Sequence, residues 1–114
     1  MRLVTRDDFD RVFKNCSSRS SDALFTVLAR PTEKNHPRLG LVVSRKAAGN
    51  AVQRHRLKRR IRESFRLGQH ELPGADIVVI ARAGISRHSQ ANVSSSLAKH
   101  WGRIRETCGQ SSSS

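Results

Sequence analysis

The chain has 114 residues, of which 22 are lysine or arginine and nine are aspartate or glutamate, so its formal net charge is +13. A chain of this length folds as one small domain around one hydrophobic core. So basic a domain needs a polyanionic partner, and nucleic acid is the partner that this charge favours. No apolar run is long enough to cross a membrane, and the N-terminal segment lacks the apolar region of a signal peptide. We therefore expect a cytoplasmic protein.

The sequence offers little for metal or covalent chemistry on the protein itself. Cys16 and Cys108 do not form a CxxC pair, and the five histidines follow neither the HxxxH nor the HExxH pattern of metal sites. Asp7, Asp8 and Asp10 are the only acidic cluster, and the first two fit the first turn of a helix, where they complement the helix dipole. We therefore predict reduced cysteines, no metal site and no catalytic residue on the protein.

The first half of the chain predicts a helix, a polar loop, a strand, a turn-rich connection, a second strand and a short basic loop. In chain order these span residues 5–15, 15–22, 23–30, 31–37, 38–44 and 45–49. Thr5 is a suitable N-cap for the first helix. Phe9, Val12 and Phe13 then fall on one face of that helix.

The second half begins with a basic helix and ends with a longer amphipathic one. In chain order it predicts the basic helix over 51–66, a loop broken by Gly68 and Pro73-Gly74, a strand over 76–82, a polar connection over 84–90 and a helix from about residue 91. Five apolar residues recur at helical spacing in that last helix, and Gly109 is its expected stop: Val93, Leu97, Trp101, Ile104 and Cys108. We predict one domain over 1–110 and a disordered serine-rich tail over 111–114.

This order of elements is typical of one architecture. A helix, two strands, a basic helix, a strand and a last helix predict a single-domain α+β sandwich in which helices pack on a small sheet. Because the basic helix stands between two strands in the sequence, it also suggests a βαβ crossover.

Residues 54–66, RHRLKRRIRESFR, are the most informative segment. They hold seven arginines or lysines and His55 against one acid, Glu63. Like charges at this density repel one another, so core packing alone does not explain them. A helix face made basic only for solubility is the alternative, but soluble surfaces normally mix both signs of charge. The preference for arginine over lysine favours bidentate contacts to phosphate.

The pattern around these charges predicts a helix with one buried stripe. Asn50 is a good N-cap, and Gln53 three residues later gives a start that is similar to a capping box. Leu57, Ile61 and Phe65 recur every four residues, so they lie on one stripe that can face a core. The basic side chains occupy most of the remaining arc and are expected to face solvent or RNA.

The run from Gly40 to Arg66 resembles the signature of the bacterial ribonuclease P protein subunit. In that family a G-x-x-V-[SA]-[KR]-K strand end precedes an A-V-x-R-N-R-x-K-R-x-x-R-E helix. The matching residues are Gly40, Val43, Ser44, Arg45, Lys46, Ala51, Val52, Arg54, Arg56, Lys58, Arg59, Arg62 and Glu63. The resemblance extends outward to Phe9, Val12, Phe13, His36–Leu41, Asp76–Arg82, Leu97 and Trp101. His55 departs from the family, which usually has Asn there.

The resemblance implies a fold, an activity and a set of partners. The fold is related to a ribosomal-protein domain and has a left-handed βαβ crossover. The activity is that of ribonuclease P, a ribonucleoprotein endonuclease that removes the 5′ leader of precursor tRNA, with catalysis in its RNA subunit and Mg²⁺ bound mainly by that RNA. The chain would be the accessory protein, with no organic cofactor and no membrane partner, and would bind ribonuclease P RNA and precursor tRNA as a monomer in a 1:1 complex with the RNA.

Two RNA-contacting surfaces follow from the resemblance. The first, on the basic helix and the loop before it, comprises Arg45, Lys46, Arg54, His55, Arg56, Lys58, Arg59, Arg60, Arg62 and Arg66. The second is a cleft for the single-stranded leader between the first helix and the sheet, with Phe9, Phe13 and Val27. Aromatic rings suit single-strand binding because every base has a face to stack on. For both phenylalanines core packing is the alternative, since their spacing is also what a core requires.

Two other classes of protein stay open. A ribosomal or RNA-chaperone protein would bind RNA with no role in cleavage, and only the helix motif separates it from a ribonuclease P protein. A DNA-binding helix protein is the second, but recognition helices usually add Asn, Gln and Ser to read base edges. Residues 54–66 are nearly all Arg and Lys, which favours phosphate-rich folded RNA.

Overall fold

The structure of the chain is a computed structural model that describes residues 6–15, 18–33, 36–72, 74–85 and 88–113. In chain order its elements are α1 (Arg6–Asn15), β1 (Ser18–Ser21), β2 (Phe25–Pro31), β3 (Arg38–Val42), α2 (Arg45–Ala48), α3 (Ala51–Gly68), the 3₁₀ turn η1 (Gln69–Glu71), β4 (Ala75–Ala81) and α4 (Gln90–Ser113). The predicted single-domain α+β fold is confirmed. Thr5, the expected N-cap of the first helix, lies outside the described residues.

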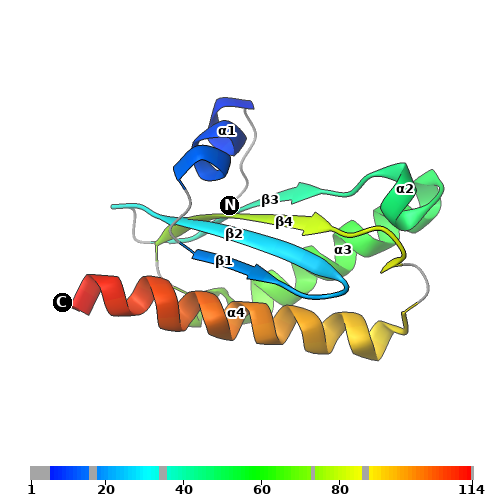
Figure 1. Cartoon of the computed structure of the whole chain (residues 1–114). Coiled ribbons are helices and arrows are strands. Elements are labelled where there is room, and N and C mark those ends of the chain that lie inside the picture. Colours follow the sequence, from blue (N-terminus) through cyan, green and yellow to red (C-terminus); the bar gives the residue numbers. More distant parts are fainter. Residues whose placement is uncertain (1–5, 16–17, 34–35, 73, 86–87, 114) are drawn as a thin grey trace.

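One mixed sheet of four strands forms the centre of the molecule, in the order β1-β2-β4-β3 (Figure 1). β2 runs antiparallel to both β1 and β4, whereas β3 runs parallel to β4. A bidentate ion pair joins the two parallel strands, with the Nε and Nη2 atoms of Arg38 at 2.7 and 2.8 Å from the carboxylate oxygens of Asp76. β3, α3 and β4 therefore make the predicted βαβ unit, and its left-handed sense stays a prediction from the resemblance.

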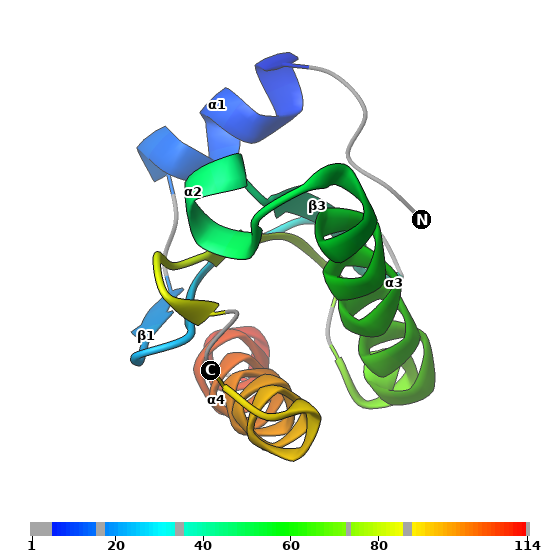
Figure 2. The same cartoon turned by 90° about the vertical axis from the view of Figure 1, so that its right-hand side faces the viewer.

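The main hydrophobic core lies between the sheet and two helices. α3 and α4 lie on one side of the sheet and α1 lies on the other (Figure 1, Figure 2). Side chains from β2, β4, α3 and α4 meet in this core, and the five largest apolar ones that are fully buried are Phe25, Ile77, Ile61, Leu97 and Ile104. At about 25 cal/mol per Å² of buried apolar area, this contact is the main stabilising interaction of the domain.

A second, smaller core lies under α1. Val12 of α1 is fully buried against Leu28 and Val78, and Phe9 and Ile80 pack beside them. The two central strands β2 and β4 are therefore covered on both faces. This explains why β4, ADIVVIA, is apolar at almost every position, as predicted for a strand buried on both sides.

The structure corrects three predictions about local structure. β1 occupies part of the segment that we predicted to be a polar loop, because its backbone pairs with β2 and its buried Ser20 is hydrogen-bonded to His100 and Arg103. The predicted basic loop before the basic helix is a single helical turn, α2, which Ser44 caps by accepting a hydrogen bond from the Ala47 N–H at 3.2 Å. α4 does not stop at Gly109 but continues to Ser113, while the disorder predicted for residues 111–114 stays a prediction. No helix of the described residues is long and apolar enough to cross a membrane.

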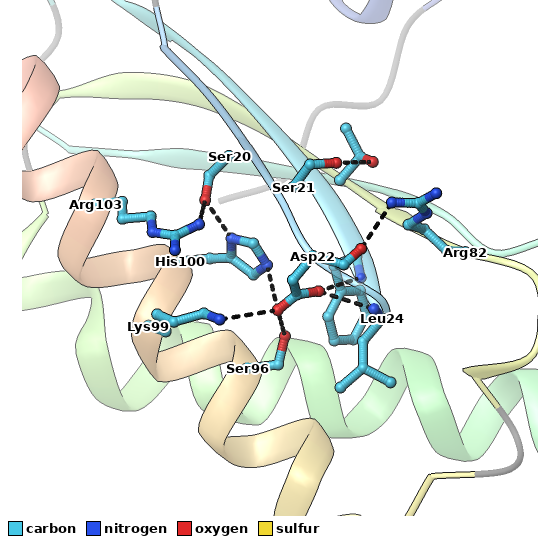
Figure 3. A network of polar contacts seen from close by, with 11 residues as sticks. Ser20, Ser21, Asp22, Leu24, Arg82, Ser96, Lys99, His100 and Arg103 are labelled. Atoms are coloured by element: carbon cyan, nitrogen blue, oxygen red, sulfur yellow. Dashed lines mark hydrogen bonds and ion pairs between the residues drawn. The ribbon is translucent and has the colours of Figure 1, made fainter.

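Asp22 fixes the turn between β1 and β2 to α4 (Figure 3). Its Oδ1 atom accepts hydrogen bonds from the N–H groups of Leu24 and Phe25, at 2.8 and 2.9 Å. Its Oδ2 atom accepts a bond of 2.6 Å from the hydroxyl of Ser96 on α4 and lies 3.6 Å from Nζ of Lys99. A single carboxylate thus holds a tight turn and a helix together.

His100 is the second link between β1 and α4, and it is fully buried. Its ring lies between Ser20 and Asp22, with Nδ1 at 2.6 Å from Oγ of Ser20 and Nε2 at 3.2 Å from Oδ2 of Asp22 (Figure 3). Arg103 also donates to the Ser20 oxygen, at 2.8 Å. An ionised carboxylate has no proton to donate, so a ring nitrogen that faces Asp22 is expected to carry its own proton, and Nδ1 then accepts the hydroxyl proton of Ser20. The proton of the neutral ring then belongs on Nε2, facing the carboxylate.

The pKa values of His100 and Asp22 are both lowered, which fits this arrangement. Burial lowers the pKa of His100, and the attraction of Asp22 offsets this only in part, so the ring is neutral at pH 7. Burial acts to raise the pKa of Asp22, but the hydrogen bonds from Ser96 and from the Phe25 and Leu24 N–H groups outweigh it, so that the pKa lies well below its usual range. A neutral histidine beside a charged carboxylate is therefore part of the folded state.

We predict that acid destabilises the fold through His100. Below pH about 6.5, the ordinary pKa of histidine, the unfolded chain binds a proton here that the folded chain binds less readily, so stability falls as pH falls, by at most about 1.4 kcal/mol per pH unit. Urea unfolding of the wild type and of His100→Gln between pH 7 and 5 measures this. The variant is expected to be less stable but to lose less on acidification, and an equal loss in both would contradict the prediction.

Candidate nucleic-acid interface

Helix α3 begins and packs as the sequence predicts. Asn50 accepts the N–H of Gln53 on its side chain at 3.0 Å, and the Gln53 side chain accepts the N–H of Asn50 at 3.2 Å, which completes a capping box. Ile61 and Phe65 are buried in the main core, and Leu57 packs against it. The apolar stripe therefore faces the sheet, and the basic arc of α3 faces away from it.

Trp101 holds α3 against α4, and its predicted place in the core is confirmed. Its ring meets that of Phe65 edge to face, with the ring centres 5.8 Å apart. Its Nε1–H donates a hydrogen bond of 2.9 Å to the hydroxyl of Ser64. These two contacts fix how α3 is rotated about its own axis, and so which of its arginines point toward α4.

The basic surface of the protein is formed by α2 and α3. We give this name to the predicted RNA-binding residues Arg45, Lys46, Arg54, His55, Arg56, Lys58, Arg59, Arg60, Arg62 and Arg66. None of these side chains is buried: seven are exposed, and Arg54, Lys58 and Arg60 are intermediate. The structure brings all ten onto two consecutive helices, while their contact with RNA stays a prediction.

One acidic residue offsets part of the positive charge of this surface. Glu63, the only acid of α3, forms an ion pair with Arg66 on the next turn. The hydrogen bond from Arg66 lowers the pKa of Glu63, and the same bond raises the pKa of Arg66, so both groups stay charged. Within the part of the chain that the structure describes, no other basic side chain of α3 forms an ion pair with a carboxylate. The surface thus keeps most of its positive charge for a partner.

Gly49 sets the angle between α2 and α3. It has φ of 90°, a conformation that side chains other than glycine rarely adopt, and its N–H closes α2 by donating to the carbonyl of Arg45 at 2.8 Å. A Cβ atom added here would lie 2.0 Å from Oε1 of Gln53, the atom that completes the capping box. Glycine is therefore required for α2, with Arg45 and Lys46, to meet the start of α3 in this way.

The three apolar residues of α1 have different environments. Val12 is 0% exposed and anchors the helix, Phe9 is partly buried against the same small core, and Phe13 is 45% exposed. Core packing, the alternative interpretation for both phenylalanines, therefore accounts for Phe9 but not for Phe13. An aromatic ring at the surface beside a sheet face is available for stacking on a partner.

Val27 does not belong to a cleft on the α1 side, and this part of the prediction is wrong. Its side chain is 0% exposed and lies in the main core, on the sheet face that α3 and α4 cover. The neighbouring Leu28 is the β2 residue that faces α1. Alternation separates Phe25, Val27 and Ala29 on one face of β2 from Thr26, Leu28 and Arg30 on the other, but it does not show which helix covers which face.

The described residues contain no group of three or more His, Cys, Asp or Glu side chains that could hold a metal ion. Positive charge and exposed apolar groups are thus what the described surface offers to a partner. Taken together, the fold and this site define a small basic α+β protein whose sheet carries one strongly basic helix.

Comparison with known proteins agrees with this description. The profile of the family described as Ribonuclease P matches residues 1–105. The ribonuclease P protein component of Idiomarina loihiensis is 44% identical over 110 residues, 96% of this chain and 88% of the relative, and that of Methylococcus capsulatus is 46% identical over 112 residues, 98% and 87%.

Solved structures give the same result. The RNase P protein of Staphylococcus aureus superposes with a TM-score of 0.82 at 34% identity, covering 93% of this chain and 95% of that one. The RNase P protein of Thermotoga maritima gives 0.80 at 38% identity, covering 91% and 97%. The chain therefore belongs to the ribonuclease P protein family, and with it to tRNA processing as the protein component of a ribonuclease complex.

We predict that Gly49→Ala destabilises the protein by about 1–2 kcal/mol, because it strains the backbone and displaces Gln53 from the capping box. Gly102→Ala is the matched control. Gly102 lies within α4, and a Cβ atom added there would meet open space, so alanine is expected to be neutral or to stabilise by up to ~1 kcal/mol. Urea unfolding of both variants measures the difference, and equal stabilities would refute the role of Gly49.

Proposed function

We propose that this chain binds the RNA subunit of ribonuclease P and the 5′ leader of precursor tRNA, and so assists the endonucleolytic removal of that leader. The observation that carries the proposal is the basic surface of α2 and α3, which is largely exposed and has no carboxylate partner apart from Glu63 among the described residues. Phosphate is the ligand that such a surface favours, since arginine offers a planar pair of donors to its oxygens.

The geometry of the surface suits the shape of folded RNA more than the reading of a base sequence. α3 presents its cations around a broad arc of one helix, and the side chains are long and flexible. Contacts of this kind position a protein on phosphates and carry little information about bases. His55 stands where the family usually has Asn, and a neutral imidazole can likewise offer one donor and one acceptor.

The leader is proposed to lie on the face of the sheet that carries α1. Phe13 supports this because its ring is exposed on a helix that is otherwise anchored by a fully buried valine. A ring held in this way can stack on an unpaired base at little cost in conformational entropy. Phe9 has a supporting role, because it packs against the small core between α1 and the sheet.

Catalysis is proposed to reside in the RNA subunit. This proposal is consistent with the described residues, which have no carboxylate cluster of the kind that holds Mg²⁺ on a protein nuclease. Mg²⁺ bound mainly by the RNA would supply the activated water. This chain, acting in the cytoplasm as a monomer with one RNA, would supply affinity and orientation of the precursor.

Reconstitution tests this proposal. The purified chain is mixed with a bacterial ribonuclease P RNA and a 5′-labelled precursor tRNA at limiting Mg²⁺, and cleavage is compared with RNA alone and protein alone. We expect cleavage at the mature 5′ end to be strong only when both are present. Cleavage by the protein alone would place catalysis on this chain. Binding of the RNA with no effect on cleavage would favour a general RNA-binding protein instead.

Phe13→Ala is predicted to weaken binding of precursor tRNA relative to mature tRNA while leaving the melting temperature nearly unchanged, because its ring is largely exposed. Val12→Ala, one residue away, is the control. It opens a cavity in the small core and is expected to cost about 1–3 kcal/mol of stability with the ratio of precursor to mature affinity preserved. If Phe13→Ala lowers stability as much as Val12→Ala and keeps the ratio, its ring has a packing role only.

A further inference from the structure

A groove runs between α3 and α4 on the side of the molecule away from α1. It consists of two hollows of about 530 and 190 Å³ that meet because both are lined by Arg56 and Arg60. The larger hollow has the size of a small-molecule pocket. We call the two together the α3–α4 groove.

The groove has a basic wall and an apolar floor. Arg56, Arg59 and Arg60 of α3 line it on one side, and Ser94 of α4 lines it on the other. Its floor includes Val93, which is buried in the main core. Leu67 also lines the groove and is 68% exposed.

The positive charges of the groove outnumber the negative charges that line it. Glu63 is the only acid that lines it, and its carboxylate is already paired with Arg66. None of the three lining arginines forms an ion pair with a carboxylate of the described residues. Arginines held this close together repel one another, so an anion between them is strongly favoured.

The neutral groups of the groove point to a ligand with more than a phosphate. Ser64 accepts the N–H of Trp101, so its own hydroxyl proton is left for a ligand acceptor. Ser94 adds a second hydroxyl, and Leu67 adds exposed apolar area beside flat guanidinium groups. A phosphate joined to a planar, partly polar ring is the chemistry that uses all of these groups together.

We propose that the α3–α4 groove binds one unpaired nucleotide of the RNA partner, with its phosphate at Arg56 and Arg60 and its base between Leu67 and the start of α4. This rests on the proposed function and deepens it. The outer arc of α3, which includes Arg62, takes phosphates of folded RNA, while the groove takes a single nucleotide that has left the stack. Ser64 and Ser94 are then specificity residues that the basic motif alone does not include.

Tryptophan fluorescence offers a direct test. Trp101 is the only tryptophan, and its Nε1–H is hydrogen-bonded to Ser64, which lines the groove. 5′-AMP, adenosine and inorganic phosphate are titrated separately into the full chain. We expect a saturable change with AMP and a much weaker response to either part alone. Equal responses to AMP and inorganic phosphate would mean a simple anion contact and would overturn the nucleotide site.

Variants then separate the groove from the outer arc. The pair Arg56→Gln and Arg60→Gln is expected to lose the AMP response, as is Ser94→Phe, which fills the groove with no change of charge. Arg62→Gln removes one charge from the outer arc and is expected to keep the response. Circular dichroism of each variant confirms that the exposed substitutions leave the fold intact.

Binding of ribonuclease P RNA completes the test. We expect the double variant Arg56→Gln/Arg60→Gln to bind the RNA about ten-fold more weakly and to release roughly two fewer counterions, as measured by the slope of log affinity against log salt concentration. Arg62→Gln is expected to release roughly one fewer. Ser94→Phe should weaken binding with the salt dependence nearly unchanged. If the double arginine variant and Ser94→Phe bind the RNA with wild-type affinity while Arg62→Gln binds it more weakly, the nucleotide site in the groove is overturned and the proposed function stands. Wild-type affinity in all of them would remove α3 from the interface and the proposed function with it.

Discussion

The packing of the apolar stripe of α3 against the sheet is the contact on which the functional surfaces of this protein depend. Ile61 and Phe65 are buried there, and their burial leaves no place for the basic side chains except the surface. Repulsion among those cations opposes folding, so the stripe has to supply enough hydrophobic stabilisation to hold them side by side. Binding of an anionic partner relieves the same repulsion, so the free energy of unfolding rises when the partner is bound to the basic surface.

The remaining contacts keep that helix in one orientation. Trp101 joins α3 to α4 by one ring contact and one hydrogen bond. α4 is in turn held to the sheet by the buried polar network around Asp22 and His100, which has defined partners on β1 and on the β1–β2 turn. Apolar packing alone would allow α4 to slide along the sheet, whereas hydrogen bonds at 2.6 Å specify one position. The width of the α3–α4 groove is a consequence of this position.

The two faces of the sheet differ in the size of the core that covers them. The face under α3 and α4 holds the main core and leaves Val27 no contact with solvent. The face under α1 has only a small core, centred on Val12, so α1 can carry Phe13 exposed without loss of its anchor. Phe13 is thus exposed at the surface, as the proposed stacking on the leader requires.

Much of the fold and of the basic surface could be predicted from the sequence, because helix caps and helical stripes depend on residues within about four positions of one another. The capping box at Asn50 and the inward stripe of α3 are examples. Tertiary structure alone decided the rest. β1 is a strand because β2 pairs with its polar residues. Val27 faces the main core because α3 and α4 cover its side of β2, which alternation along the strand does not show. The α3–α4 groove exists only because a helix from a distant part of the chain lies beside the arginines, a relation that no local pattern records.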